Sequence, residues 1–248
     1  MHQINDVANK YYIADAPAKN ITKIVYLDFN VSPEIIHYYR SSLSTKESLK
    51  LESIKLKSRR DQFIITRAIT RKIIADSINC PQNEIDFGIQ QYGKPYCSTP
   101  NIGLHFNLSH SLDVGVIAIN LTQEIGIDVQ QHRPQQRIIK MAQRFFSDSE
   151  IQLIEQLPEA DLERAFFHIW VRKEALLKAT GTGFTQGLSR YAVVSDQLKS
   201  SQCYLQCDNN DYYIHDIPAP PHYSSAVASK QLNCKFTVCD WRHPEVGH

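Results

Sequence analysis

The segment from Asp161 to Gly183 constrains the fold of this 248-residue chain more than any other stretch. It contains no proline, and its first glycine is Gly181, so nothing interrupts a helix before that point. Its apolar residues recur at helical spacing and are Phe166, Phe167, Trp170, Ala175, Leu176, Leu177 and Ala179. The Thr-Gly-Thr-Gly run at 180–183 is typical of a helix end, because glycine readily takes the left-handed cap conformation. The sequence therefore predicts one long helix around which the other elements are organised.

One face of this helix carries groups that could do chemistry. Trp170, Glu174 and Lys178 are spaced four residues apart, which places them one above the other on a helix. A carboxylate and an ammonium beside a large aromatic ring can form a catalytic face. The same spacing also describes an ordinary surface ion pair, worth a few tenths of a kcal/mol. The helix alone leaves both interpretations open.

Composition excludes several classes of function. The net charge of +1 shows no basic excess, so nothing favours a nucleic-acid partner. Six cysteines are scattered without a CxxC pair, which is not typical of a zinc site or a disulfide framework. The N-terminus lacks the apolar core of a signal peptide, and no run is long enough to span a bilayer. We expect a reduced, cytoplasmic protein that binds neither nucleic acid nor membrane.

The first part of the chain predicts a strand, one or two short helices, an amphipathic helix and a second strand. These fall at residues 23–30, 32–57, 61–78 and 85–90, after a polar lead-in at 1–20. The helix at 61–78 places Arg67 and Arg71 beside its apolar stripe. We favour a structural role for these arginines, with a solvent-facing position as the alternative. A turn then holds Lys94 between a glycine and a proline.

A buried strand end is expected at 104–111, where Asn107, Ser109, His110 and Ser111 crowd polar groups together. The segments 113–120 and 124–131 predict a β-hairpin. Asp128 is the single acid between apolar neighbours in the second of these strands. A buried carboxylate must be paired, hydrogen-bonded or metal-bound to remain ionised, unless it caps a turn at the strand end.

The rest of the chain predicts two more helices before the long one, and then strands. The helices fall at 134–146 and about 147–156, the second with Ser147 and Glu150 in a capping box. Short strands are expected near 190–195, 202–207, 211–216, 224–229 and 234–240, followed by a frayed tail. Strands joined by hairpin-length turns favour an α+β fold over a parallel α/β sheet.

Four segments, in their order and spacing, resemble the 4′-phosphopantetheinyl transferase superfamily in its Sfp-type group. They are YGKP (92–95), FNLSHS (106–111), GIDVQQ (126–131) and FHIWVRKEALLKATGTG (167–183). The third and fourth are similar to the two defining motifs of the family, and RFF (144–146) resembles a further block. The resemblance covers roughly residues 44–190. The tryptophan and Lys-Glu-Ala variant of the long-helix motif is similar to a subgroup seen in cyanobacteria and in polyketide or peptide pathways.

The resemblance implies a fold and a reaction. It implies two similar α+β halves related by a pseudo-twofold axis, here residues 1–112 and 113–248, with the active site in the cleft between them and the metal site carried by the second half. The implied enzyme transfers the 4′-phosphopantetheine arm of coenzyme A to a serine hydroxyl of an apo acyl or peptidyl carrier protein and releases 3′,5′-ADP. Mg²⁺, or Mn²⁺ in its place, is the implied metal, and the pseudo-dimeric fold implies a monomer.

The resemblance also implies residue roles. Asp128 and Glu174 match the metal-binding carboxylates, and Lys178 matches the family lysine near the transferring phosphate. Four residues match coenzyme A contacts, with His110 at the 3′-phosphate and Lys50 on the weakest alignment: Lys50, Lys94, Ser109 and His110. These assignments agree with elementary chemistry, since phosphoryl transfer needs positioned charge more than covalent catalysis.

Gln130 departs from the commoner pattern of the Sfp-type group, which has a second acid at this position. Strand alternation places residues 128 and 130 on the same face, so Gln130 can offer a neutral oxygen to the metal or hold a metal-bound water. Two rival functions remain: a different magnesium-dependent phosphotransferase, and a carrier-binding module without catalysis. The chain has no glycine-rich phosphate loop, which disfavours the first, and it retains Asp128, Glu174 and Lys178, which disfavours the second.

Overall fold

The computed structural model describes residues 21–101, 103–134, 137–181, 187–194, 200–232 and 234–245. The expected lead-in at 1–20, residues 182–183 of the cap run and the tail end at 246–248 lie outside this range. The helices are α2 (Pro33–Arg40), α3 (Thr45–Glu52), α4 (Lys57–Ile78), α5 (Ile138–Phe145), α6 (Asp148–Glu155) and α7 (Glu159–Thr180), with short 3-10 turns η1 (Gln82–Glu84) and η3 (Leu188–Arg190). The strands are β1 (Ile21–Asp28), β2 (Asp86–Ile89), β3 (Pro95–Thr99), β4 (His105–Ser111), β5 (Val114–Asn120), β6 (Ile125–Gln131), β7 (Gln202–Cys207), β8 (Asn210–Asp216), β9 (Tyr223–Ser229) and β10 (Lys235–Asp240).

The strands form two four-stranded sheets and one separate hairpin. The first sheet has the order β10-β1-β5-β4, the second has the order β6-β9-β8-β7, and β2 pairs with β3. Pairing among the described strands is antiparallel except between β1 and β10. The predicted α+β class is therefore confirmed.

The chain runs twice through the same order of elements. A strand is followed by two helices of 8 residues and one of 22 residues, first as β1-α2-α3-α4 and then as β6-α5-α6-α7. In each half the leading strand pairs antiparallel with a later strand, β5 for β1 and β9 for β6. This repetition confirms the two similar halves that the sequence predicts.

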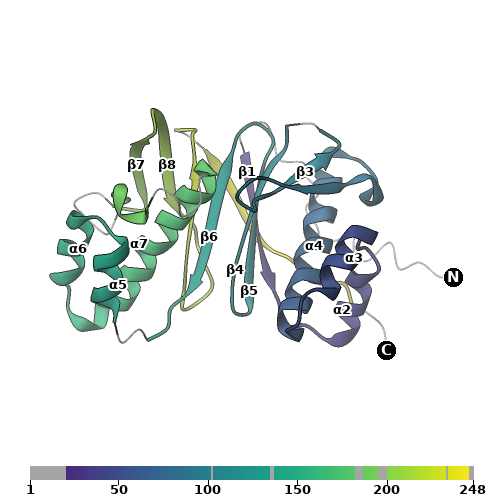
Figure 1. The fold of residues 1–248 in the computed structure, drawn as a ribbon, viewed down its shortest axis with the longest axis horizontal. Helices are drawn as coiled ribbons and strands as arrows, with labels where there is room; N and C mark the ends of the chain where they lie inside the picture. The colour runs from purple at the N-terminus through teal and green to yellow at the C-terminus, as the bar shows by residue number, and fades with distance from the viewer. Residues whose placement is uncertain are drawn as a thin grey trace.

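The molecule has helices on its two flanks and the sheets between them (Figure 1). One apolar core lies between α4 and the first sheet, and another lies between α7 and the second sheet. A third core joins the sheets through the inner faces of β1, β5, β6 and β9. The C-terminal segment returns to the N-terminal half, where the His243 ring hydrogen-bonds the Tyr39 hydroxyl and Trp241 Nε1 donates to the same hydroxyl.

Two sequence predictions need correction. The segments of β5 and β6 do not form a hairpin, because β5 pairs with β4 and β1 while β6 pairs with β9. Asn120 Oδ1 accepts hydrogen bonds from Thr122 N and Gln123 N, which turns the chain from one sheet to the other. The strand expected at 190–195 is also absent from the described part of that segment, which contains the end of η3 and irregular chain.

The expected boundary between the two halves after residue 112 stays a prediction, and in the structure this residue lies in the turn of the β4–β5 hairpin. The change of sheet occurs at residues 121–124, and β10 of the second half completes the first sheet.

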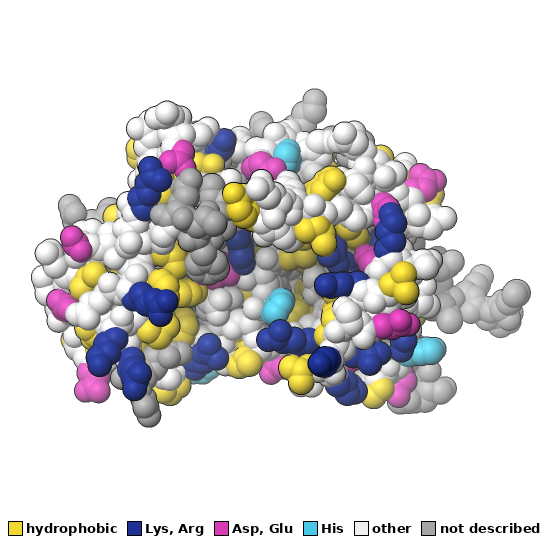
Figure 2. Space-filling view, viewed as in Figure 1, with side chains coloured by type: hydrophobic (Ala, Val, Ile, Leu, Met, Phe, Trp, Pro, Cys, Tyr) yellow, Lys and Arg dark blue, Asp and Glu magenta, His cyan; other side chains and the backbone are white. Residues whose placement is uncertain are grey.

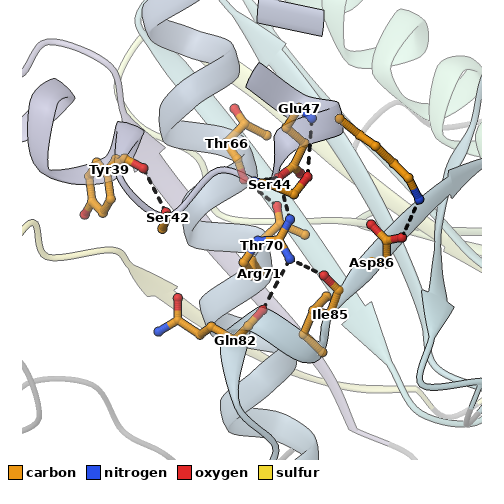
Figure 3. A network of polar contacts seen from close by, with 11 residues as sticks. Tyr39, Ser42, Ser44, Glu47, Thr66, Thr70, Arg71, Gln82, Ile85 and Asp86 are labelled. Carbon is orange, nitrogen blue, oxygen red and sulfur yellow. Dashed lines mark hydrogen bonds and ion pairs between the residues drawn. The ribbon is translucent and has the colours of Figure 1, made fainter. Parts of the chain in front are cut away.

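The N-terminal half contains a buried charge network that fixes α3 against α4 (Figure 3). Arg71 of α4 donates from Nη2 to Glu47 Oε2 at 2.5 Å, and from Nη1 to the carbonyls of Gln82 and Ile85. Glu47 also completes the capping box of α3 with Ser44. Arg71 therefore has the structural role that the sequence favoured.

Candidate active site

Side chains alternate along β6, so that its apolar residues lie on one face and Asp128 lies on the other. Ile125, Ile127 and Val129 enter the core between the sheets. The residues between them, including Gly126 and Asp128, lie on the opposite face, against α7. The single acid in this strand is therefore directed at the long helix.

Asp128 is almost completely buried but well supplied with donors. Its carboxylate accepts from Ser109 Oγ at 2.6 Å, from Lys178 Nζ at 2.7 Å and from Gln130 Nε2 at 3.4 Å. The side chain is only 2% exposed. A buried carboxylate needs such partners to remain ionised. The alternative role, capping a turn at the strand end, does not match these contacts.

Glu174 is also buried, but within the described part of the chain its carboxylate accepts no hydrogen bond. Burial and, to a smaller extent, the charge of Asp128 raise the pKa of Glu174 to about 7, and the opposing effect of Lys178 is included in that value. The two carboxylates therefore interact closely, as the sequence predicts. A carboxylate short of donors beside a second carboxylate is a favourable place for a cation.

Lys178 joins the helix to both sheets. Besides Asp128, its ammonium donates to Ile127 O at 3.0 Å and to Leu108 O of β4 at 3.5 Å. Asp128, Glu174 and Lys178 thus converge where α7, β6 and β4 meet. The surface-pair interpretation of Glu174 and Lys178 is wrong, since Glu174 is buried and Lys178 pairs with Asp128 instead.

Gly126 permits this convergence because the backbone of α7 lies directly over it. A Cβ atom at this position would overlap Ala175 O and Ala179 N. These are backbone atoms of a regular helix, which cannot yield as a side chain does. Glycine at 126 therefore brings Glu174 and Lys178 within reach of Asp128.

Trp170 lies outside this group, although it shares the spacing of Glu174 and Lys178. Its ring stacks on Phe166 at 5.6 Å and meets Phe145 edge to face at 5.4 Å. It belongs to the aromatic core between α5 and α7, so the aromatic side of the predicted catalytic face is structural.

The donor set fits a hard divalent cation in part. With both acids ionised, two carboxylates against one ammonium leave one negative charge, and Glu174 retains free acceptor capacity. In the described ranges no group of three or more His, Cys, Asp or Glu side chains could hold a metal. Gln130 directs its amide nitrogen at Asp128, and a half-turn of the amide would direct Oε1 there instead. Magnesium commonly binds to one or two carboxylates and takes its remaining ligands from phosphates and water.

Strand β4 presents a polar row to the open edge of β6. Asn107 Oδ1 accepts from Ile127 N at 2.9 Å, and Ser111 Oγ accepts from Gln131 N at 3.1 Å. Ser109, between them, donates to Asp128. The sequence grouped these polar residues but did not indicate that Asn107 and Ser111 join the two sheets. Their alternation along β4 was the available signal.

His110 points away from this row, toward the N-terminal half. Its ring meets Phe29 edge to face at 6.3 Å. Desolvation lowers its pKa, and the charges of Lys178 and Arg59 lower it further. His110 thus lies between cations from both halves. On the face shown in Figure 2, lysine and arginine side chains gather over the helices of the N-terminal half.

The two remaining predicted residues lie apart from Asp128. Lys50 is exposed on α3. Lys94 is 11% exposed and forms an ion pair with Glu124 Oε2 at 2.5 Å. Glu124 also contacts His105 Nδ1 at 3.0 Å. Sequence reasoning missed Glu124 and His105, since neither belongs to a periodic pattern or to the resembling segments.

No helix in the described ranges is both long and apolar enough to cross a membrane.

Comparisons with known proteins agree with the repeated architecture. Residues 124–235 match the model of the 4′-phosphopantetheinyl transferase superfamily, and residues 28–122 match the N-terminal 4′-phosphopantetheinyl transferase model. These two spans meet where the chain passes between the sheets.

Individual relatives extend the match. The chain is 31% identical to slr0495 of Synechocystis sp., over 74% of this chain and 75% of that protein. It is 34% identical to HetI of Nostoc sp. over 59% and 62% of the two chains, and 27% identical to Sfp of Bacillus subtilis over 83% and 90%. HetI and Sfp are both named 4′-phosphopantetheinyl transferases. With these matches and the geometry above, the chain belongs to the 4′-phosphopantetheinyl transferase superfamily.

Proposed function

We propose that this protein transfers the 4′-phosphopantetheine arm of coenzyme A to a serine hydroxyl of an apo acyl or peptidyl carrier protein. The single observation that carries the proposal is Glu174, a buried carboxylate that lies beside Asp128 and Lys178 and accepts no hydrogen bond from any residue that the structure describes. In a chain of this superfamily, that arrangement fits the metal and acid–base centre of the transfer.

The reaction balances without a redox partner. The serine oxygen forms a bond to the phosphorus atom that carries the pantetheine arm. The bond from that phosphorus to the bridging oxygen breaks, and the electron pair leaves with 3′,5′-ADP. The hydroxyl proton must be accepted by a base.

Asp128 and Glu174 would hold a divalent metal, Mg²⁺ or Mn²⁺. When bound, this ion supplies charge neutralisation to the diphosphate. Gln130 lies beside Asp128 and would contribute a neutral oxygen or orient a metal-bound water. Because only two protein carboxylates take part, we infer that the diphosphate of coenzyme A completes the site.

Glu174 and Lys178 would carry the proton and charge changes. A carboxyl whose pKa lies at about 7 is matched to accept the serine proton near neutral pH, directly or through water. Lys178, one helical turn further, would neutralise charge that develops on the leaving phosphate.

Residues on the N-terminal side would bind the nucleotide end of coenzyme A. His110 lies beside the cation Arg59, which suits the 3′-phosphate. Ser109 holds Asp128 and borders the same strand end, and exposed Lys50 on α3 is free to meet a phosphate from solution. Lys94, the fourth residue expected to contact coenzyme A, already has three acceptors for its ammonium.

The proposed partners follow from this site. Both halves contribute residues, Ser109 from the first and Asp128 from the second, so one chain completes the centre and we propose a monomer. The near-zero net charge gives no reason to expect a nucleic-acid partner. We propose a cytoplasmic location, where coenzyme A and carrier proteins are present.

The test is to incubate the protein with coenzyme A, magnesium and an apo carrier protein, and then to measure the carrier mass. We expect the mass to rise by one phosphopantetheine group and 3′,5′-ADP to appear. Asp128→Asn should abolish the rise, while Asp161→Asn, at the exposed start of α7, should not. Another phosphotransferase would give a different mass, and a binding module would give none.

A further inference from the structure

The ammonium of Lys94 is already fully hydrogen-bonded within the protein, unlike that of a lysine available to bind a ligand. It ends the turn between β2 and β3, where Gln90 N donates to Lys94 O at 2.9 Å. Its ammonium donates to Glu124 Oε2 at 2.5 Å, to Lys178 O at 3.1 Å and to Ile125 O at 3.3 Å. An ammonium has three N–H bonds, so each already has an acceptor.

These contacts join the two halves. The β2–β3 hairpin belongs to the N-terminal half and reaches toward the ends of β6 and α7 (Figure 1), whereas all three acceptors belong to β6, its leading turn or α7. Glu124 is oriented from the other side by His105 of β4. The His105 hydrogen bond, aided by Lys94, lowers the pKa of Glu124 to about 2, so this carboxylate remains charged at neutral pH.

The acceptors of Lys94 lie where helix and strand approach most closely. Lys178 O is among the last carbonyls of α7, which lack intrahelical donors and form the negative end of the helix dipole. Ile125 immediately precedes Gly126, over which the α7 backbone lies. Lys94 therefore holds the last turn of α7 against the start of β6. The side chain of Lys178 leaves this same turn to reach Asp128.

We propose that Lys94, held by Glu124, is a positioning residue that fixes Lys178 beside Asp128, rather than a coenzyme A contact. The inference rests on the proposed function, because it assumes that Lys178 serves the transfer. It extends that function to Glu124, which belongs to none of the segments that resemble the family.

The test compares Lys94→Met, Glu124→Gln and the double variant in steady-state transfer assays over a range of coenzyme A concentrations. A lost anchor that displaces Lys178 should lower kcat roughly tenfold to hundredfold, with KM for coenzyme A within about twofold of wild type. Because the two residues act together, the double variant should be no worse than Lys94→Met. Lys46→Met, which removes an exposed ion pair with Asp86, is the matched control and should change neither constant.

A direct coenzyme A contact predicts a different pattern, and that pattern would overturn the proposal. Lys94→Met would then raise KM with kcat unchanged, and Glu124→Gln would leave KM unchanged or lower it, because the ammonium is released. Hydrogen exchange without substrates supplies an independent readout. Amides at 177–181 and 125–127 should exchange faster in both single variants, and unchanged exchange there would also refute the proposal. Because this readout needs no transfer, an inactive wild-type protein would contradict the proposed function while leaving the positioning role testable.

Discussion

The two halves share one order of elements, but the face that the leading strand turns toward its long helix has a different role in each half. On the helix-facing side of β1, Val25 and Leu27 belong to the core beneath α4. On the corresponding side of β6, Gly126 and Asp128 meet α7. The first half uses this junction for packing, and the second uses it to bring a carboxylate to the helix. At the same position in the repeat, apolar packing in the first half thus corresponds to a charged contact in the second half.

Two equally buried glutamates, one in each half, differ in the same way in the hydrogen bonds that they accept. Glu47 in the first half and Glu174 in the second are each 8% exposed. Glu47 accepts hydrogen bonds from Arg71 and from the Ser44 backbone, whereas Glu174 accepts none from the described residues. The difference indicates that Glu47 stabilises the fold, and it is consistent with the role we propose for Glu174, which is to bind a cation and accept a proton at some cost in stability.

The largest expected effect is on activity. Glu174→Gln removes a metal-binding charge and the proton acceptor, so transfer at saturating coenzyme A should fall roughly thousandfold, as in other losses of transition-state stabilisation. The free energy of unfolding at pH 8 should equal or exceed that of wild type, because the amide no longer ionises in a buried position. Mass-based transfer assays and urea unfolding measure the two quantities. Transfer within tenfold of wild type would contradict the assigned role.

The matched variant in the other half should show the opposite result. Glu47→Gln leaves Arg71 buried without its counter-ion, so the free energy of unfolding should fall by about 3 kcal/mol. Folded protein should still transfer at nearly the wild-type kcat when coenzyme A is saturating. If Glu47→Gln leaves stability unchanged, the two glutamates do not differ in the way proposed.

A smaller effect is expected from adding a side chain at Gly126, where the backbone of α7 packs directly on β6. Gly126→Ala forces the α7 backbone away from Asp128, which should cost about 2 kcal/mol of stability and lower kcat roughly tenfold. Gly115→Ala in β5 is the control, since its added Cβ would meet the end of the Phe29 ring, a side chain that can move, at 2.6 Å. Thermal unfolding and transfer assays on both variants test this. Equal losses would show that helix placement over Gly126 has no special importance.

The pH dependence of stability should separate two groups on α7. Burial and, to a smaller extent, the charge of Arg172 lower the pKa of His168 to about 4. Above the ordinary pKa of about 6.5, neutral His168 costs nothing. Its contribution to stability is lost as the pH falls from there toward 4. Glu174 has the opposite sign: its raised pKa favours the folded state below about 4.5, and that contribution is lost as the pH rises through 7.

These opposing contributions overlap between pH 4.5 and 6.5, so the variants must be combined. In a Glu174→Gln background, stability should fall by about 1–3 kcal/mol as the pH drops from 6.5 to 4. Adding His168→Gln should remove most of that loss. Urea unfolding at a series of pH values measures both, and identical curves for the two proteins would contradict the assignment to His168.

Local patterns predicted the elements well but not how distant segments pair. The long helix, the Ser147 capping box and the apolar stripe of α4 follow from spacing within one segment, and the structure contains all three. The hairpin predicted for 113–131 was wrong because two adjacent apolar strands carry no information about which sheet each joins. The sheets are defined by pairing with distant strands, β6 with β9 and β5 with β1, and Asn107 and Ser111 of β4 accept hydrogen bonds from amides on the free edge of β6.

The site could be predicted as far as residue types and motif spacing determine it. The meeting of Asp128, Glu174 and Lys178 followed from the family resemblance, and the structure brings them together. The contacts of Lys94 could not be predicted, since Glu124 has no periodic or motif signal. The placement of Trp170 on the catalytic face was wrong for a related reason. Helical spacing does not distinguish an aromatic ring in the core from one in an active site.

The most direct test of the central claim is calorimetric titration of Mg²⁺ into the protein with bound coenzyme A, in two buffers of different ionisation enthalpy at pH 7. If Asp128 and Glu174 hold the metal, binding must displace the proton from those molecules in which Glu174 is protonated, since burial raises its pKa to about 7. The account predicts measurable proton release by wild type, and weaker binding without that release by Glu174→Gln. Equal metal affinity and equal proton release in the two proteins would contradict it.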